Sequence, residues 1–319
     1  MEKACRLIEE AARNDAKVVG FGEGFVPTFP HWASVNRAKP LKDRLASRYL
    51  TLFKNAVEVP SRATDELCQA ARESDCYVVI GINEKDPGTM GTMYNSQLFI
   101  DRMGRLLGKH RKLVPTLGER LVHTGGDGST LRVFDTDLGR LGGLICGEHN
   151  NLLAKYALFA WGESIHVASW PAFMCNWGGD FILQQYAYEG KVFVISASDF
   201  ISPETQEELR GDLEVSEMGG GSSGIYGPRG QILAKAKTDR EEILYADVDP
   251  EEIIKAKMSH DITGHYNRFD VFKLTVNEEA LSPIGTLPRT SGARPKGPEV
   301  EEPVTPPPLK KLEVPSHLA

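Results

Sequence analysis

Long apolar runs are absent from this sequence of 319 residues. None approaches the roughly 18 residues that a membrane-spanning helix requires, and the opening MEKACRLIEE lacks the apolar core of a signal peptide. Clusters of basic residues are also missing, and the formal net charge is -7. A chain without a basic surface is poorly suited to neutralise phosphate backbones. We therefore expect a cytoplasmic protein that binds neither membrane nor nucleic acid.

Patterns typical of disulfide frameworks and metal sites are scarce as well. The cysteines form an odd set without a C-x-x-C pair, and no two histidines have H-x-x-x-H spacing beside an acidic partner. We therefore expect no metal and no other cofactor. Any cysteine that matters for function should act as a free thiol. The cysteines are Cys5, Cys68, Cys76, Cys146 and Cys175.

Helical and strand patterns alternate through the first 280 residues. Residues 3–13 have apolar side chains at helical spacing, and residues 17–21 read as a short buried strand. A second helix and strand are predicted at 64–73 and 77–82. This alternation, with hairpins among the later elements, predicts an α/β protein with mixed sheets. The later elements are hairpins at 96–101/105–109, 131–135/141–146 and 224–226/232–235, helices at 151–161, 181–190 and 250–257, and strands at 166–169, 192–196 and 243–248.

The composition changes near residue 281. Nine of the nineteen prolines lie in the last 39 residues. Proline removes backbone donors and blocks helix formation, so such a segment cannot bury enough apolar surface to offset its ordering entropy. We therefore expect one domain over residues 1–280 and a flexible Pro-rich tail over residues 281–319.

Cys146 is the first candidate for chemistry. It follows the apolar strand at 141–145 and precedes Gly147 and a predicted helix, so a sharp turn would expose its sulfur. The positive end of a helix dipole favours a thiolate and would lower the pKa of the cysteine. The alternative is a buried cysteine that acts as a small apolar side chain.

Glu23 and Lys112 are weaker candidates when each is taken alone. Glu23 directly follows a buried strand and lies between Gly22 and Gly24. Burial would raise its carboxyl pKa toward neutrality, which suits a general base, although an exposed turn acid is the simpler interpretation. Lys112 lies in a basic segment that would ordinarily be a solvated face.

Together these segments resemble the nitrilase branch of the nitrilase superfamily. The matching motifs are F-G-E-G-F-V-P-T-F-P-H-W at 21–32, G-K-H-R-K-L-V-P-T at 108–116 and L-G-G-L-I-C-G-E-H at 141–149. The segment G-E-R-L-V-H-T-G-G-D-G-S at 118–129 is similar to the region of the family's second active-site glutamate, which places that role on Glu119. G-H-Y-N-R-F-D-V at 264–271 resembles the closing segment. The resemblance covers about residues 1–275.

The resemblance implies an α-β-β-α sandwich that assembles into homodimers or larger spiral oligomers. It also implies that the Cys146 thiolate attacks a small-molecule nitrile while Glu23 manages the protons. The product is a carboxylic acid and ammonia, formed through a thioimidate and then a thioester. Lys112 would stabilise developing negative charge, and Glu119 would position Lys112 or a water molecule.

Some positions depart from the family's pattern. No strand of the form V-A-A-V-Q precedes the first helix, so we expect either that the start of the sequence is misplaced or that the fold lacks that strand. The family's usual Trp after the nucleophile is Gly147 here, and its tyrosines near the glutamate match Phe29 and His31. With Glu148 and Trp170, these two residues are the candidates for substrate contacts.

The helix after the nucleophile is expected to bury one face inside the fold and another against a second subunit. This expectation rests on apolar residues that should be exposed on it, namely Leu152, Tyr156, Phe159 and Trp161.

Three alternatives remain open. An amidase or carbamoyl-amide hydrolase would use the same Glu-Lys-Cys set, and a cyanide hydratase or dihydratase would act on a related substrate. The C-G-E-H run and the Glu119-Arg120 segment favour a nitrilase. A catalytically idle scaffold is the third, although retention of all four polar positions argues against it.

Overall fold

Four strands from the first half of the chain form one sheet, in the order β1-β2-β3-β4. The computed structural model describes residues 1–34, 42–172, 179–209, 220–237 and 240–282. β1 pairs in parallel with β2, whereas β3 and β4 continue the sheet as antiparallel hairpins. No described strand pairs with the other edge of β1. The strands are β1 Val18–Gly20, β2 Tyr77–Lys85, β3 Met93–Ile100 and β4 Leu106–Arg111.

Six strands form a second sheet, in the order β10-β9-β8-β7-β6-β5. Its centre, β6 to β8, is parallel, and antiparallel strands extend it on both sides. Both sheets are therefore mixed. The strands are β5 Phe134–Thr136, β6 Gly139–Ile145, β7 Ile165–Trp170, β8 Phe193–Ser198, β9 Gly224–Tyr226 and β10 Ile232–Lys235.

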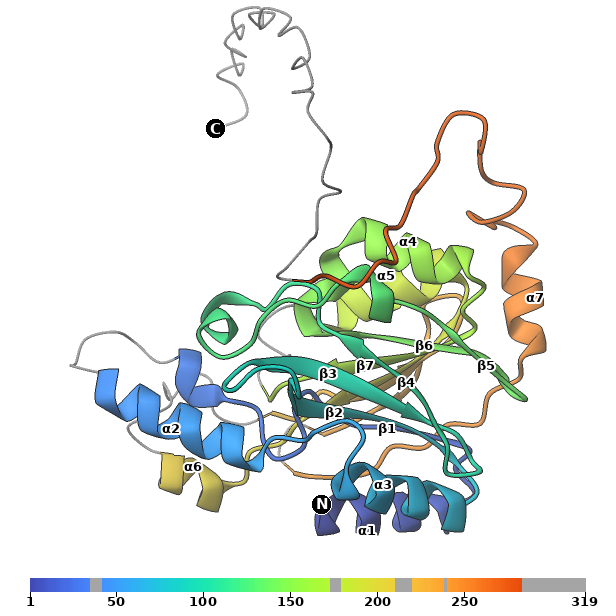
Figure 1. The fold of residues 1–319 in the computed structure, drawn as a ribbon. Helices are drawn as coiled ribbons and strands as arrows, with labels where there is room; N and C mark the ends of the chain where they lie inside the picture. The colour runs from blue at the N-terminus through green and yellow to red at the C-terminus, as the bar shows by residue number, and fades with distance from the viewer. Residues whose placement is uncertain (35–41, 173–178, 210–219, 238–239, 283–319) are drawn as a thin grey trace, which may run out of the picture. The chain divides into compact units, whose positions relative to one another are not determined.

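Helices cover the outer face of each sheet. The helices α1 (Glu2–Ala12) and α3 (Arg62–Glu73) lie against the first sheet, and α4 (Leu152–Ala160) and α5 (Gly179–Gly190) lie against the second (Figure 1). This layering confirms the predicted α-β-β-α sandwich. The remaining helices are α2 Lys42–Asn55, α6 Pro203–Leu209 and α7 Glu251–Lys257, with 3-10 helices η1 His31–Ser34, η2 Leu117–Leu121, η3 Gly128–Thr130 and η4 Cys146–Asn150.

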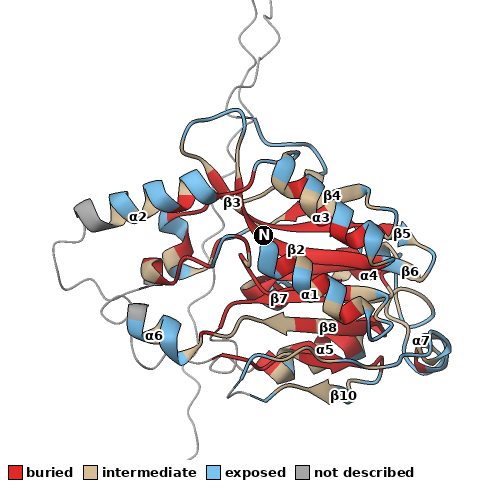
Figure 2. Ribbon diagram, turned by 90° about the horizontal axis from the view of Figure 1, so that it is seen from below, coloured by how far each residue is buried: buried red, intermediate tan, exposed pale blue. Residues whose placement is uncertain are grey.

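Strand β2 shows how sequence alternation builds the layers. Its even-numbered residues Val78 and Ile80 pack in the cluster under α1 and α3, whereas Tyr77 and Val79 pack between the two sheets. Successive side chains of a strand point to opposite faces, so one apolar run serves both layers. The central strands are accordingly buried along most of their length (Figure 2).

Two predictions about the later elements are wrong. Residues 243–248 form no strand. Residues 241–245 instead make polar contacts at α1 and the turn after it, an ion pair of Lys3 with Glu241 and a hydrogen bond from Asn14 to Tyr245. An apolar run becomes a strand only where a sheet edge accepts its backbone groups. Phe159 is also buried rather than exposed, because it packs against Tyr186 on α5.

The chain divides into two units, Met1–Leu281 and Ser282–Ala319. Residues 283–319, where most of the predicted tail falls, lie outside the described residues. Within the described ranges, no helix has both the length and the apolar character needed to cross a membrane.

Candidate active site

Three of the predicted site residues lie just beyond the carboxyl ends of strands. Glu23 follows β1, Lys112 follows β4 and Cys146 follows β6. Glu23 and Lys112 come together because β1, β2 and β4 run in the same direction in the first sheet. All three are buried, with exposed fractions of 0%, 1% and 9%.

The Lys112 ammonium lies between two carboxylates. Its Nζ is 2.7 Å from Glu23 Oε1 and 2.6 Å from Glu119 Oε2. The same oxygen of Glu119 accepts the backbone N–H of Thr116 at 2.6 Å. The structure therefore brings Glu119 into one cluster with Glu23 and Lys112, as the sequence predicts.

Asn95 on β3 is a member of this cluster that the sequence reasoning missed. Its Nδ2 donates to Glu23 Oε1 at 2.6 Å and to Glu119 Oε1 at 2.8 Å, and its backbone carbonyl accepts the N–H of Lys112 at 2.8 Å. We expected the strand to begin at residue 96, which left Asn95 in a loop. The available signal was the run of three polar residues, Asn95 to Gln97, directly before the apolar residues Leu98 to Ile100.

One ammonium cannot neutralise two ionised carboxylates, so the cluster favours a proton on one of them. Burial raises the pKa of Glu23 well above its ordinary value, and Lys112 offsets this only in part. Burial is the largest influence on Glu119 and opposes its ionisation, but the charge of Lys112 together with hydrogen bonds from Lys112, Glu23 and Thr116 outweighs it and lowers the pKa of Glu119. The pKa of Lys112 is raised despite burial, because both carboxylates favour its charged form. The expected high pKa of Glu23 is thus confirmed in direction.

Cys146 has a strained backbone, with φ at 51°, a region that residues with a side chain rarely adopt. The expectation of a lowered thiol pKa is wrong. Burial raises the pKa of Cys146 well above its ordinary value, and the nearby charge of Glu23 adds to the increase. The helix after the nucleophile begins as the short η4, and α4 starts only at Leu152, so the dipole effect of a long helix is missing at the sulfur. The thiol must therefore lose its proton to a base as it attacks.

Glu23 Oε2 is suited to accept that proton. This oxygen is buried and has no hydrogen-bond partner among the described residues. A buried carboxylate oxygen without a partner is ready to bind a proton from a thiol or a water molecule.

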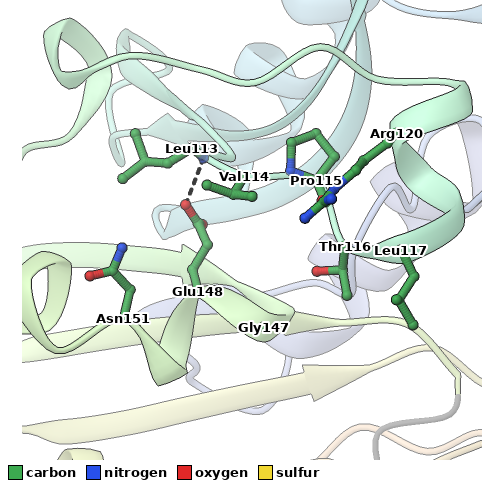
Figure 3. A pocket seen from close by; sticks show the side chains of 9 residues that line it. All are labelled: Leu113, Val114, Pro115, Thr116, Leu117, Arg120, Gly147, Glu148 and Asn151. Carbon is green, nitrogen blue, oxygen red and sulfur yellow. Dashed lines mark hydrogen bonds between the residues drawn. The ribbon is translucent and has the colours of Figure 1, made fainter. Parts of the chain in front are cut away.

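The Glu148 carboxylate is fully engaged with its own protein. One oxygen accepts the N–H of Leu113 at 2.7 Å, and the other accepts the N–H of Ile145 at 2.9 Å and lies 3.0 Å from His110 Nε2. These contacts tie the segment after β4 to the nucleophile turn. Glu148 also lines a pocket of about 300 Å³ beside that turn (Figure 3).

This pocket lies between the segment of the lysine and the segment of the nucleophile. Gly147 forms part of its wall, and a Cβ atom built on Gly147 would lie 3.0 Å from Thr116 Oγ1. A larger residue after the nucleophile would therefore have to displace Thr116. The lining residues are Leu113, Val114, Pro115, Thr116, Leu117, Arg120, Gly147, Glu148 and Asn151.

The other candidates for substrate contacts are buried near the Glu23 segment. Phe29 packs edge to face on His31, with ring centroids 4.9 Å apart, and burial lowers the pKa of His31 to about 4. The backbone carbonyl of Trp170 accepts the N–H of Glu23 at 3.1 Å, and the indole ring of Trp170 stacks on His149. Trp170 Nε1 is buried and has no partner among the described residues.

Comparison with known proteins assigns the family. A model of the family described as carbon-nitrogen hydrolase matches residues 1–258. The chain belongs to the carbon-nitrogen hydrolase family. In the described part of this carbon-nitrogen hydrolase, no three His, Cys, Asp or Glu side chains group in a way that could hold a metal ion.

Curated relatives of this carbon-nitrogen hydrolase include several nitrilases. An aliphatic nitrilase of Rhodococcus rhodochrous is 38% identical over 299 residues, which are 90% of this chain and 80% of the relative. Nitrilase 3 of Arabidopsis thaliana is 33% identical over 303 residues, covering 92% and 86% of the two chains. These relatives confirm the resemblance to nitrilases.

The solved structures agree in fold. Nit3 of Saccharomyces cerevisiae, a member of branch 10 of the nitrilase superfamily, has a TM-score of 0.64 at 24% identity and covers 83% of this chain and 89% of its own. NitFhit of C. elegans has a TM-score of 0.65 at 18% identity, covering 88% of this chain and 64% of its own.

Proposed function

We propose that this enzyme hydrolyses an organic nitrile to the carboxylic acid and ammonia, with Cys146 as the nucleophile. The observation that carries the proposal is the buried cluster of Lys112 between Glu23 and Glu119, in a chain whose relatives are named nitrilases. Burying such charges costs several kcal/mol, a cost that a purely structural site could avoid with apolar residues. The cluster therefore favours an enzyme over an idle scaffold.

The first half of the reaction forms a carbon–sulfur bond. The Cys146 thiol gives its proton to the ionised Glu23 and adds to the nitrile carbon, and the nitrile nitrogen then takes that proton, leaving a thioimidate. Lys112 stabilises the negative charge that develops on nitrogen. A fixed charge in a water-poor site contributes roughly 3 to 4 kcal/mol on the scale known for oxyanion donors.

The second half breaks the same bond. Glu23 takes a proton from a water molecule that adds to the thioimidate carbon and passes it to the nitrogen, which gives a tetrahedral carbon bearing a hydroxyl and an amino group. Glu23 then moves the hydroxyl proton to the nitrogen as the carbon–nitrogen bond breaks and ammonia leaves. The thioester that remains is hydrolysed by a second water, which releases the acid and restores the thiol. Two waters are consumed for each nitrile. The chemistry requires no cofactor.

The supporting residues take distinct roles in this proposal. Glu119 and Asn95 fix Lys112 and Glu23 in place through the hydrogen bonds described above. Glu148 positions the nucleophile turn, because its two oxygens are already occupied by protein donors. Phe29, His31 and Trp170 are the residues that we propose to contact the substrate.

The test is ammonia release from a panel of small aliphatic and aromatic nitriles, with the matching amides and cyanide alongside. Release from nitriles, with the acid as product, supports the proposal. Turnover confined to amides would replace it with an amidase or carbamoyl-amide hydrolase. Consumption confined to cyanide would replace it with a hydratase if formamide is the product, or with a dihydratase if formate and ammonia are the products. No consumption of any substrate, with Cys146 alkylated normally by iodoacetamide, would favour the scaffold.

We also propose that the enzyme self-associates into a homodimer or larger spiral oligomer through the surface beside α4. Leu152 and Leu153 are 67% and 66% exposed, and Val114 and Leu117 are exposed on the neighbouring segment. Exposed apolar side chains gathered in this way are typical of an interface. Light scattering should give a mass above that of one chain, and a Leu152→Glu/Leu153→Glu variant should shift it toward the monomer. A monomeric parent would contradict the proposal.

Two further expectations remain proposals. We place the enzyme in the cytoplasm, which cell fractionation would test. We also propose that residues 281–319 are dispensable for chemistry, so truncation after Glu279 should leave activity per active site within a few fold.

A further inference from the structure

Four buried side chains form a chain behind the nucleophile turn and take no part in the steps above. His149 Nδ1 lies 2.7 Å from the Cys146 carbonyl oxygen, and His149 Nε2 lies 2.9 Å from His166 Nε2. His166 Nδ1 lies 2.7 Å from Glu163 Oε1. The hydroxyl of Tyr186 donates to Glu163 Oε2 at 2.6 Å. An unbroken line of hydrogen bonds therefore joins a buried carboxyl group to the backbone of the nucleophile.

Three elements of the second half of the fold carry or make room for this chain of hydrogen-bonded side chains. Glu163 precedes β7, His166 lies on β7, and Tyr186 lies on α5. Opposite them, Gly142 lies within β6, where a Cβ atom would come 2.0 Å from Glu163 Oε1. Glycine weakens the interior of a strand, and here it leaves the space that the carboxyl group occupies.

The acceptor at the end of the chain fixes the position of every proton. A carbonyl oxygen can only accept, so His149 Nδ1 must carry a hydrogen and its Nε2 must accept one. His166 therefore carries its hydrogen on Nε2, and its Nδ1 must accept from Glu163. Glu163 can donate only as a neutral carboxylic acid. In that state every link is satisfied and no charge is buried.

We propose that Glu163, His166 and His149 are positioning residues that hold the Cys146 turn in its reactive shape only while Glu163 carries its proton. The inference rests on the proposed role of Cys146 as nucleophile. The turn needs such support, since its positive φ is a strained conformation for a residue with a side chain.

Loss of the Glu163 proton leaves two hydrogens for three links. The ionised carboxylate favours the His166 tautomer that carries its hydrogen on Nδ1, because this hydrogen can be donated to Glu163. His166 Nε2 then has no hydrogen and acts as an acceptor. His149 must then donate from Nε2, and its Nδ1 lone pair faces the carbonyl oxygen of Cys146. The hydrogen bond that is lost is therefore the one between His149 and the Cys146 carbonyl oxygen, although the proton leaves Glu163 at the other end of the hydrogen-bonded chain.

The surroundings keep the chain neutral in the working range. Burial raises the pKa of Glu163 to about 8, which the Tyr186 hydroxyl offsets only in part. Burial lowers the pKa of His149 to about 3 and that of His166 well below its ordinary value. The titratable groups that face the imidazoles are His110 of β4 with Glu148 of η4, and Lys155 of α4, which pairs with Glu189 of α5.

The Glu163→Gln variant separates the proposal from a purely structural role. Its amide can donate to His166 Nδ1 and accept from Tyr186, but it cannot ionise. We expect kcat at pH 7 within about threefold of the parent, and an alkaline decline that begins at least about one pH unit later. Asp135→Asn, which removes an exposed carboxylate on β5, should keep the parent profile. Superimposable profiles for Glu163→Gln and the parent, or a folded but inactive Glu163→Gln, would overturn the proposal.

A second measurement does not depend on turnover. Selective ¹⁵N labelling of histidine reports which ring nitrogen carries the hydrogen. In the parent, the hydrogen on His149 should move from Nδ1 to Nε2 between about pH 6 and about pH 9.5. Unchanged tautomers across that range would overturn the proposal even if Glu163→Gln failed to fold. If the tautomers move but no substrate is hydrolysed, the proposed function fails and the linkage between Glu163 and the turn stands.

Discussion

The side-chain amide of Asn95 lies 2.6 Å from Glu23 Oε1, so a residue on β3, two strands away from β1 in the sheet, holds the proposed general base. The donor stabilises the ionised form of Glu23. Because Asn95 also donates to Glu119, it fixes the distance between the two carboxylates.

Replacing Asn95 by Leu, which has a similar size, should remove both donors. We expect the pKa of Glu23 to rise further, so the acidic limb of the kcat/KM profile should move to higher pH, with kcat at pH 7 lowered about tenfold or more. Gln69→Leu on α3 is a surface control for loss of an amide. An Asn95→Leu enzyme with the parent profile would show that the amide has no role in tuning Glu23.

The covalent mechanism makes separate predictions for the other residues. Cys146→Ala should release no ammonia, and Lys112→Met should lower kcat by at least about 10², as expected for loss of a charge-stabilising group. Glu119→Gln should slow turnover but leave the thiol able to react. Intact-mass spectrometry of this variant should therefore detect an adduct on Cys146. Turnover near the parent rate in Cys146→Ala would remove the basis of the mechanism.

The raised pKa of Glu23 predicts how activity depends on pH. Below its pKa the carboxyl is neutral and cannot accept the thiol proton, so kcat/KM should rise as pH increases through that value. The midpoint of this acidic limb should lie above 4.5, the ordinary value for glutamate. Stopped-rate assays of ammonia release from pH 4 to 8 would measure it. A profile that stays flat down to about pH 4.5 would place the base elsewhere.

Much of the fold follows from local pattern, and the exceptions depend on tertiary partners. The apolar alternation of residues 77–82 predicts β2 and the layers on both sides of it. Residues 243–248 have a similar pattern but form no strand, because no described sheet edge pairs with them. The helix α2 was missed although Tyr49, Leu52 and Phe53 lie on one face of it; their partners, such as Met93, are distant in sequence.

The residues of the candidate site could be predicted where each lies within a short sequence segment that resembles a family motif. Glu23, Lys112, Glu119 and Cys146 lie in recognisable segments, and the structure gathers the first three into one hydrogen-bonded cluster. The thiol pKa was mispredicted because burial outweighs a short helix turn, and burial is a property of the assembled sandwich. Similarly, nothing local in His149 or Glu163 indicates that they belong to one chain.

The stability of the Lys112 cluster should also respond to pH. Lys112→Met leaves two buried carboxylates without a cation, which should lower the free energy of unfolding at pH 7 by about 3 to 5 kcal/mol. Both carboxyls then have folded-state pKa values above their unfolded values, so the loss should shrink as pH falls toward the unfolded pKa. Urea unfolding at pH 7 and pH 5 would measure this. Lys155→Met, which breaks a more exposed pair with Glu189, should cost less.

Gly142 gives a structural test of the chain behind the nucleophile. A methyl group at this position would come 2.0 Å from Glu163 Oε1, so Gly142→Ala must displace the carboxyl group and break its bond to His166. We expect kcat at pH 7 to fall about tenfold or more, with a stability loss of about 1 to 3 kcal/mol from overpacking. Gly143→Ala is the matched control on the same strand. Its methyl group would come 2.7 Å from Gln97 Oε1 and 2.8 Å from the backbone carbonyl oxygen of Val167, neither of which belongs to the hydrogen-bonded chain.

The two alanine variants separate positioning of the turn from general damage to β6. Both should lose stability to a similar degree, but only Gly142→Ala should lose the ordered tautomers of His149 and His166 and the rate that depends on them. Urea unfolding, kcat and histidine ¹⁵N spectra on the same preparations would compare them. Equal losses of kcat in both variants would mean that the rate depends on the packing of β6, and not on a hydrogen bond delivered to the Cys146 carbonyl from Glu163.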